Sequence, residues 1–167
     1  MVWKLMFASV AGFAARVVPI AVASPPAKNF VAGAPDDMEL NPSPIEPSWI
    51  IAGTPVARLA EHSRGLDDAA LTAVWDCTAG SFRWHFGWDE TVMILEGEVH
   101  ITTEDGVERM LGAGDVAYFA GGTWATWRID RYVRKVAFCR KPFPKPLTMA
   151  YRLRDFVRQG GIEGIAA

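Results

Sequence analysis

The chain has 167 residues, of which 50% are hydrophobic and 22% are charged. This composition is typical of one globular domain with tails and not of a disordered chain. The formal net charge of −2 gives no reason to expect nucleic acid, because phosphate binding needs a clustered basic face. Seven Trp and nine Phe are many for this length and favour a β-rich protein with a cavity. Two cysteines, Cys77 and Cys139, are too few for a disulfide framework and are expected to be buried thiols.

Residues 1–54 read as an apolar segment followed by a proline-rich arm. The uninterrupted apolar run over 5–15 is too short to span a bilayer, which takes about 20 residues, so no transmembrane span is expected. The letters AVAS at 21–24 resemble a cleavage site, but Arg16 interrupts the apolar stretch that an export signal needs. We therefore expect a cytoplasmic protein, with an export signal as the alternative. The prolines between 24 and 55 favour extended backbone, so they predict an arm and not a helix.

Short strands are predicted from about Leu71 to Cys139. Runs such as FRWHF at 82–86 alternate hydrophobic and polar residues with a period of two, and turn signals separate the runs. Asp105-Gly106 is one of these signals and predicts a hairpin. Seven or eight such strands without a helical period indicate an all-β sandwich or barrel, with boundaries at about 55–142.

A linker and a C-terminal α-helix are predicted in the last segment, 143–167. Within Leu147–Gln159, apolar residues recur at helical spacing and arginines occupy other positions, and Gly160-Gly161 provides a stop. The apolar residues are Met149, Leu153, Phe156 and Val157, and the arginines are Arg152, Arg154 and Arg158. We expect this helix to pack on the barrel, with a membrane-surface or partner-binding element as the alternative.

The residues from Gly80 to Gly97 and from Gly114 to Trp127 resemble the two sequence motifs of the cupin superfamily. The first motif has a His-x-His pair, a Glu after three or four residues and a Gly after six more; Glu90 and Gly97 match its end. The second motif begins with a Gly and ends in a His. More narrowly, the run from Trp75 to Lys135 resembles the branch of ureidoglycine aminohydrolase and the ethanolamine-utilisation cupins. The resemblance implies a jelly-roll barrel, also called a double-stranded β-helix.

The resemblance also implies a metal site of three His and one Glu, from which this chain departs. With a four-residue spacing before Glu90, His85 stands at the second His position and Arg83 at the first. The fourth ligand position falls on Ala125. Only His85 and Glu90 then remain as metal ligands, and two protein ligands rarely hold a divalent ion. No metal is favoured, and a rebuilt site that recruits another side chain such as His62 is the less favoured alternative.

Two functions are consistent with these residues, one of a binding protein and one of an enzyme. In the first, the barrel binds a small polar or anionic molecule through Arg83, His85, Glu90, Tyr118 and Trp127, with a guanidinium–carboxylate pair in place of the metal. In the second, His85 and Glu90 are catalytic residues of an enzyme of the ureidoglycine aminohydrolase or isomerase kind, which a divalent transition metal would assist. A homodimer is expected in either case, because cupins commonly pair through barrel edges and a proline-rich arm suits edge cover.

Overall fold

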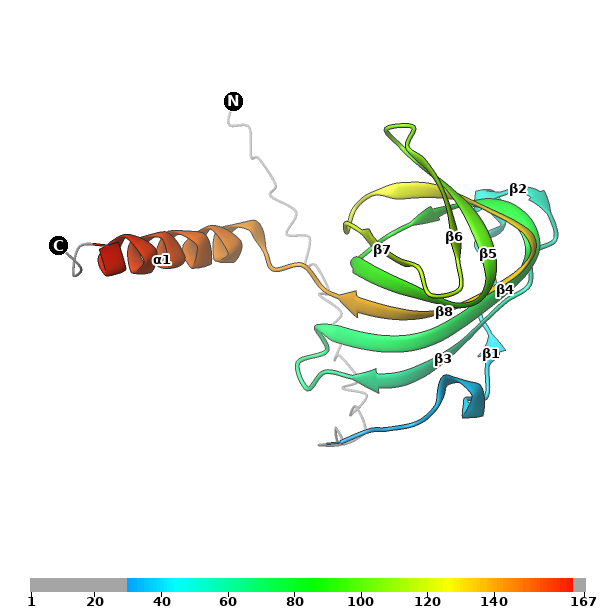
Figure 1. The fold of residues 1–167 in the computed structure, drawn as a ribbon, viewed down its shortest axis with the longest axis horizontal. Coiled ribbons are helices and arrows are strands. Elements are labelled where there is room, and N and C mark those ends of the chain that lie inside the picture. The colour runs from blue at the N-terminus through cyan, green and yellow to red at the C-terminus, as the bar shows by residue number, and fades with distance from the viewer. Residues whose placement is uncertain (1–29, 164–167) are drawn as a thin grey trace, which may run out of the picture.

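The computed structural model describes residues 30–163, so the apolar run over 5–15 and the cleavage-like letters at 21–24 lie outside the described residues. Strands make up most of the described chain, and one α-helix follows them (Figure 1). The elements are η1 (Pro35–Asp37), β1 (Asn41–Pro42), η2 (Pro47–Trp49), β2 (Ile50–Gly53), β3 (Ala57–Arg64), β4 (Ala70–His85), β5 (Asp89–Thr103), β6 (Glu108–Gly112), β7 (Val116–Phe119), β8 (Trp124–Arg140) and α1 (Lys145–Glu163).

Three long antiparallel strands, β4, β8 and β5, lie side by side and build the barrel wall. One half of each strand shares a layer with β3 and β7, and the other half shares a layer with β2 and β6. The strands curve around a common interior (Figure 1). This arrangement confirms the predicted all-β jelly-roll fold with strands over most of the run from Leu71 to Cys139.

The long strands bend where their pairing register shifts. The β5–β8 register changes around Gly97, which has a φ of 72°. A Cβ at this position would lie 2.0 Å from the carbonyl oxygen of Tyr132, so only glycine fits. The predicted Asp105-Gly106 hairpin is confirmed, because these residues form the turn between β5 and β6.

The core lies inside the barrel and is rich in aromatic rings. The rings of Phe86 and Phe119 are stacked with centroids 4.3 Å apart, and those of Phe82 and Trp127 are stacked at 6.4 Å. Trp75 meets the Trp127 ring edge-on at 6.0 Å. Offset-stacked and edge-on pairs are the arrangements that aromatic quadrupoles favour, so these rings specify one packing of the interior.

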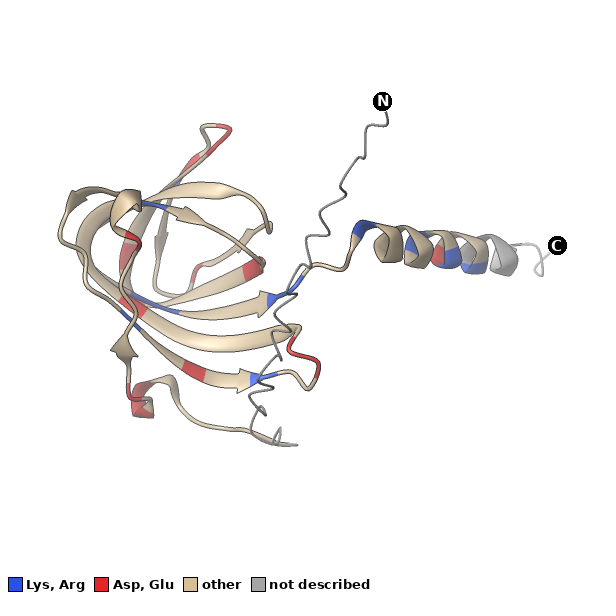
Figure 2. Ribbon diagram, turned by 180° about the vertical axis from the view of Figure 1, so that it is seen from behind, with Lys and Arg blue, Asp and Glu red and all other residues tan. Residues whose placement is uncertain are grey.

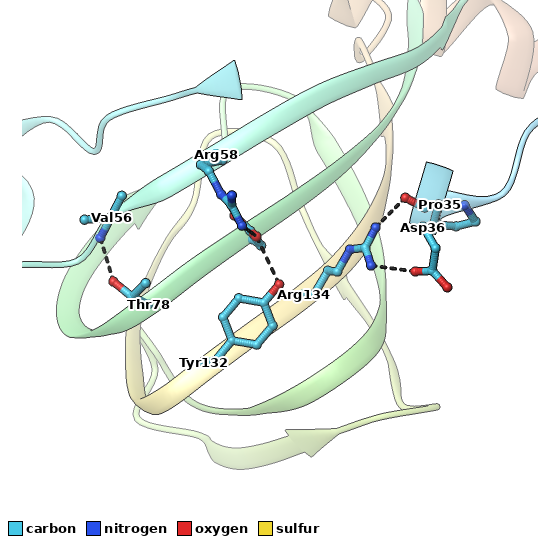
Figure 3. A network of polar contacts seen from close by, with 8 residues as sticks. Pro35, Asp36, Val56, Arg58, Thr78, Tyr132 and Arg134 are labelled. Atoms are coloured by element: carbon cyan, nitrogen blue, oxygen red, sulfur yellow. Dashed lines mark hydrogen bonds and ion pairs between the residues drawn. The ribbon is translucent and has the colours of Figure 1, made fainter. Parts of the chain in front are cut away.

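The proline-rich arm lies along the barrel, as predicted, and two of its segments pair with the sheet. β1 pairs with β3 and β2 pairs with β4, which gives extended edge residues backbone partners. Arg134 on β8 holds the arm through Asp36, 2.5 Å away, and through the carbonyl oxygen of Pro35 (Figure 3). Trp49 packs against the core from η2.

The C-terminal helix is present where the sequence predicts one, but the expectation that it packs on the barrel is wrong. α1 projects away from the sheets after the segment at 141–144 (Figure 1). Its apolar side chains are exposed, including Phe156 at 75% and Leu153 at 65%. The period of an amphipathic helix reports that one face is apolar and does not report what covers that face. Among the described residues, no helix has the length and hydropathy needed to cross a membrane.

Candidate functional site

The barrel-facing side of β4 is the opposite of the predicted one. Phe82 and Phe86 are buried at 0% and 1% exposure, and Trp84 packs against the core. Arg83, between them, has a side chain that is 54% exposed. Alternation divides a strand into two faces without saying which is inner, and burial of the aromatic rings decides this in favour of Phe82, Trp84 and Phe86.

This orientation also corrects the motif assignment. The cupin motif allows three or four residues between the second His position and the Glu, and the structure corresponds to three. Trp84 and Phe86 then stand at the two His positions, and Glu90 remains at the Glu position. Ala125, at the fourth position, is buried and pairs with Trp84.

Glu90 has a cation beside it inside the barrel, and that cation is Lys135. The Nζ atom of Lys135 donates to Oε1 of Glu90 at 2.6 Å, with side-chain exposures of 5% and 12%. The predicted pair of Arg83 with Glu90 is therefore wrong. β5 and β8 are neighbours, and the alternation along each of them turns Glu90 and Lys135 into the same interior.

Two tryptophan rings surround the ammonium group of Lys135. Nζ lies 4.5 Å from the ring centroid of Trp127 and 5.0 Å from that of Trp75. A cation over the face of an indole is attracted to it, more strongly when water is excluded. Both indole Nε1 groups are buried, and neither has a hydrogen-bond acceptor in the structure. Buried donors normally have a hydrogen-bond partner. These two N–H groups can therefore donate to an acceptor from outside the chain.

The thiols lie along the same interior faces. Burial raises the pKa of the Cys139 thiol to about 11. The Glu90 carboxylate raises this pKa further, and the Lys135 ammonium lowers it. Burial likewise raises the pKa of Cys77 to about 12. Both cysteines are free. A thiol that stays protonated is a poor nucleophile and a poor metal ligand, so these two act as small apolar groups.

These residues do not fit the metal site of the cupin motif. Trp84, Phe86 and Ala125 offer no metal-binding atom, and the ammonium of Lys135 already neutralises Glu90. Over residues 30–163, no three His, Cys, Asp or Glu side chains gather in a way that could hold a metal ion.

The other predicted site residues lie apart from this pair. Arg83 lies outside the barrel with its guanidinium 4.7 Å from the ring centroid of Trp124 and 4.0 Å from Glu104. His85 stacks at a tilt on the same Trp124 ring, 4.8 Å away. Tyr118 is 62% exposed, and only Trp127 joins Glu90 in the interior.

The outer face carries a shallow polar groove of about 460 Å³ beside these residues. It crosses β4, β8, β5 and β6 and is lined by side chains that include Ser81, His100, Thr102, Thr126 and Arg128. His100 and Arg128 each approach Asp130 at 3.5 Å. These two contacts pair part of the charge in the groove within the chain.

Sequence reasoning missed Lys135 and Trp75. The signal was available in YVRKVAFC at 132–139, where Val133, Lys135 and Ala137 share one face of a period-two strand. A lysine on an apolar face needs a buried partner, and Glu90 was the candidate. The adjacent Arg134, which points outward to the arm, obscured this because either cation could occupy the interior face.

Comparison with known proteins agrees with the fold. Residues 64–137 match the model of the EutQ-like cupin domain. No curated protein matches the chain. A protein of unknown function of the DUF861 family from Pseudomonas syringae pv. tomato is 27% identical with a TM-score of 0.57. The match covers 61% of this chain and 44% of that one, so this chain spans less than half of that protein's length.

Two further solved structures are similar over shorter stretches. A DUF861 family protein from Thermotoga maritima is 36% identical over 38% of this chain and 73% of its own, with a TM-score of 0.37. A putative ethanolamine utilization protein from Salmonella typhimurium is 24% identical over 51% of this chain and 69% of its own, with a TM-score of 0.46. With a jelly-roll fold and the match over residues 64–137, the chain belongs to the cupin superfamily, in its EutQ-like branch.

Proposed function

We propose that the protein is a cupin that works without a metal and binds a small anionic molecule inside the barrel. The observation that carries this proposal is the ammonium group of Lys135, buried beside Glu90 in the interior. An ammonium group has three donors, and one of them meets Glu90. The remaining donors, together with the buried indole N–H groups of Trp75 and Trp127, suit the oxygens of a carboxylate or a similar anion.

The aromatic walls supply the rest of the binding energy in this proposal. Trp75, Trp127 and Phe82 offer apolar surface around one charged anchor, which is the usual composition of a small-molecule site. Lys135 alone provides the positive charge, and Glu90 favours ligands that carry a hydrogen-bond donor beside their anionic group. A small hydroxy or amino carboxylate therefore fits the pair better than a simple fatty acid.

The enzyme alternative, of the ureidoglycine aminohydrolase or isomerase kind, has less support from the geometry. It relies on His85 and Glu90 acting together on one substrate. His85 stacks on Trp124 on the outer side of β4, whereas Glu90 is bonded to Lys135 inside. Catalysis needs both groups within hydrogen-bonding reach of the reacting atoms, so the binding role is the better match.

Metal analysis and anion titration together test the proposal. We expect purified protein to hold well under one equivalent of Fe, Mn, Ni or Zn. Acetate, glycolate, glycine and oxalate would be titrated while the intrinsic fluorescence of the tryptophans is recorded. The double variant Lys135→Met with Glu90→Gln keeps the packing but removes the charge, and we expect it to lose the response. Arg83→Met is the matched control and should keep it.

Two results would contradict the proposal. One is stoichiometric metal that the double variant loses. The other is an anion response that is unchanged in the double variant and lost in Arg83→Met. The homodimer and the cytoplasmic location remain predictions from the sequence.

A further inference from the structure

The C-terminal helix α1 has no partner in the described chain. From Lys145 to Arg158, every side chain except the half-buried Thr148 is exposed. Four large apolar side chains are 64–75% exposed: Met149, Leu153, Phe156 and Val157. Helices alone in water are marginal, and most of their stability comes from packing an apolar face against something. An external surface that covers this face would supply that stability.

The apolar side chains form one stripe, and cations flank it. Met149, Leu153, Phe156 and Val157 are spaced at i, i+4, i+7 and i+8. At about 100° per residue, Arg152 falls at one edge of this stripe and Arg154 at the other. Figure 2 shows the basic residues along the helix, with an acidic residue among them.

The charge balance of the helix decides what kind of surface fits. From Lys145 to Glu163 the helix has four cations and two anions, Asp155 and Glu163, and Asp155 lies opposite the stripe and pairs with Arg154. Two copies of this helix packed stripe to stripe would bring arginines against arginines. An anionic lipid surface instead satisfies the cations at both edges while its acyl boundary takes up the apolar stripe.

We propose that α1 lies on the surface of a bilayer that contains anionic lipids and attaches the barrel to it. The stripe enters the boundary between headgroups and acyl chains, and Arg152 and Arg154 at its two edges contact lipid phosphates. This is attachment to the surface and not a transmembrane span. The segment at 141–144, which contains Pro142 and Pro144, joins the helix to β8 as a short spacer.

Vesicle co-sedimentation of the full-length protein tests this proposal. Vesicles of phosphatidylcholine with 30% phosphatidylglycerol would be compared with vesicles of phosphatidylcholine alone. We expect binding to the anionic vesicles only, falling as salt rises. Phe156→Glu should weaken it at least tenfold. Arg152→Gln with Arg154→Gln should weaken it by about fivefold per residue. Val116→Glu places the same charge at an exposed apolar position on β7 and should change nothing.

Three results would overturn the proposal. Binding that is equal for both kinds of vesicle and independent of salt would remove the role of the arginines. Binding that Phe156→Glu leaves intact would assign attachment to another part of the chain. Absence of vesicle binding, with an oligomer that Phe156→Glu converts to monomer, would show that the stripe is covered by a second copy. All the altered positions are exposed, so loss of folding does not confuse the comparison.

Discussion

An ion pair inside the barrel and an ion pair outside it differ in how strongly they are expected to affect folding. Inside, the ammonium of Lys135 lies 2.6 Å from Glu90, with both side chains almost out of contact with water. Outside, Arg83 approaches Glu104 at 4.0 Å, and both side chains are 54% exposed. Water screens the outer pair, so its contribution to folding is small. Removing one partner of the inner pair should lower the free energy of unfolding strongly, because either charge alone in that interior would be unfavourable.

Two more ion pairs fall between these extremes. Asp76 is 2% exposed and accepts from Arg58, which is half exposed, and from the hydroxyl of Tyr132 at 3.0 Å (Figure 3). Asp89, at 14% exposure, meets Arg140 at 2.6 Å. When both partners are counted, the four ion pairs thus form a series from the interior to the surface, and the series predicts the order in which their loss affects stability.

The largest effect is expected for Lys135→Met. It leaves Glu90 in the interior without its cation, which typically destabilises a protein by about 3–5 kcal/mol. The measurement is the free energy of unfolding by denaturant titration, in parallel with wild type. A loss smaller than about 1 kcal/mol would mean that the interior pair matters no more than a surface pair.

Asp76→Ala should have the next largest effect. It removes the acceptor of Arg58 and Tyr132 and leaves the Tyr132 hydroxyl, which is partly buried, without its partner. Losing a buried charge-assisted hydrogen bond typically destabilises by about 1.5–3 kcal/mol. Burial, the Asp76 hydrogen bond and the Asp76 charge raise the pKa of Tyr132 to about 12. An ultraviolet titration should show that pKa falling toward the ordinary value in the variant, whereas an unchanged pKa would exclude the contact.

Asp89 gives a smaller effect that depends on pH. The backbone N–H of Gly121 and the side chain of Arg140 lower the pKa of this carboxyl. A carboxyl with a lowered pKa in the folded state stabilises the fold above the ordinary value of about 3.9, and this stabilisation is lost as the pH falls through the folded-state pKa. The difference in stability between wild type and Asp89→Asn should therefore be constant from pH 7 to 5 and shrink below pH 4. A difference that grows on acidification would refute this.

Arg83→Met should have the smallest effect. This substitution removes the guanidinium, and with it the 4.0 Å approach to Glu104 and the contact with the ring of Trp124. Both contacts lie at the surface. We expect a change within about 1 kcal/mol. A loss as large as that of Lys135→Met would place Arg83 in the interior after all.

The sequence predicted the fold better than the site because the two depend on different information. Period-two runs, the Asp105-Gly106 turn and the Glu90 to Gly97 spacing are local patterns, and they specify strands and a jelly roll. The direction in which a strand faces is not local: FRWHF has two faces, and the packing of Phe82 on Trp127 and of Trp84 on Trp49 selects the inner one. The partner of Glu90 lies 45 residues away on β8, in a pairing that no local pattern specifies.

The central claim, that Lys135 and Glu90 form one energetic unit in the place of the family's metal, is tested most directly by a double-mutant cycle. The stabilities of Lys135→Met, Glu90→Gln and the double variant would be measured against wild type, with Arg83→Met and Glu104→Gln as the matched surface cycle. We expect the interior double variant to recover most of the loss of Lys135→Met, which gives an interaction energy of about 2–3 kcal/mol, and the surface cycle to give less than about 0.5 kcal/mol. Additive losses in the interior cycle would contradict the account.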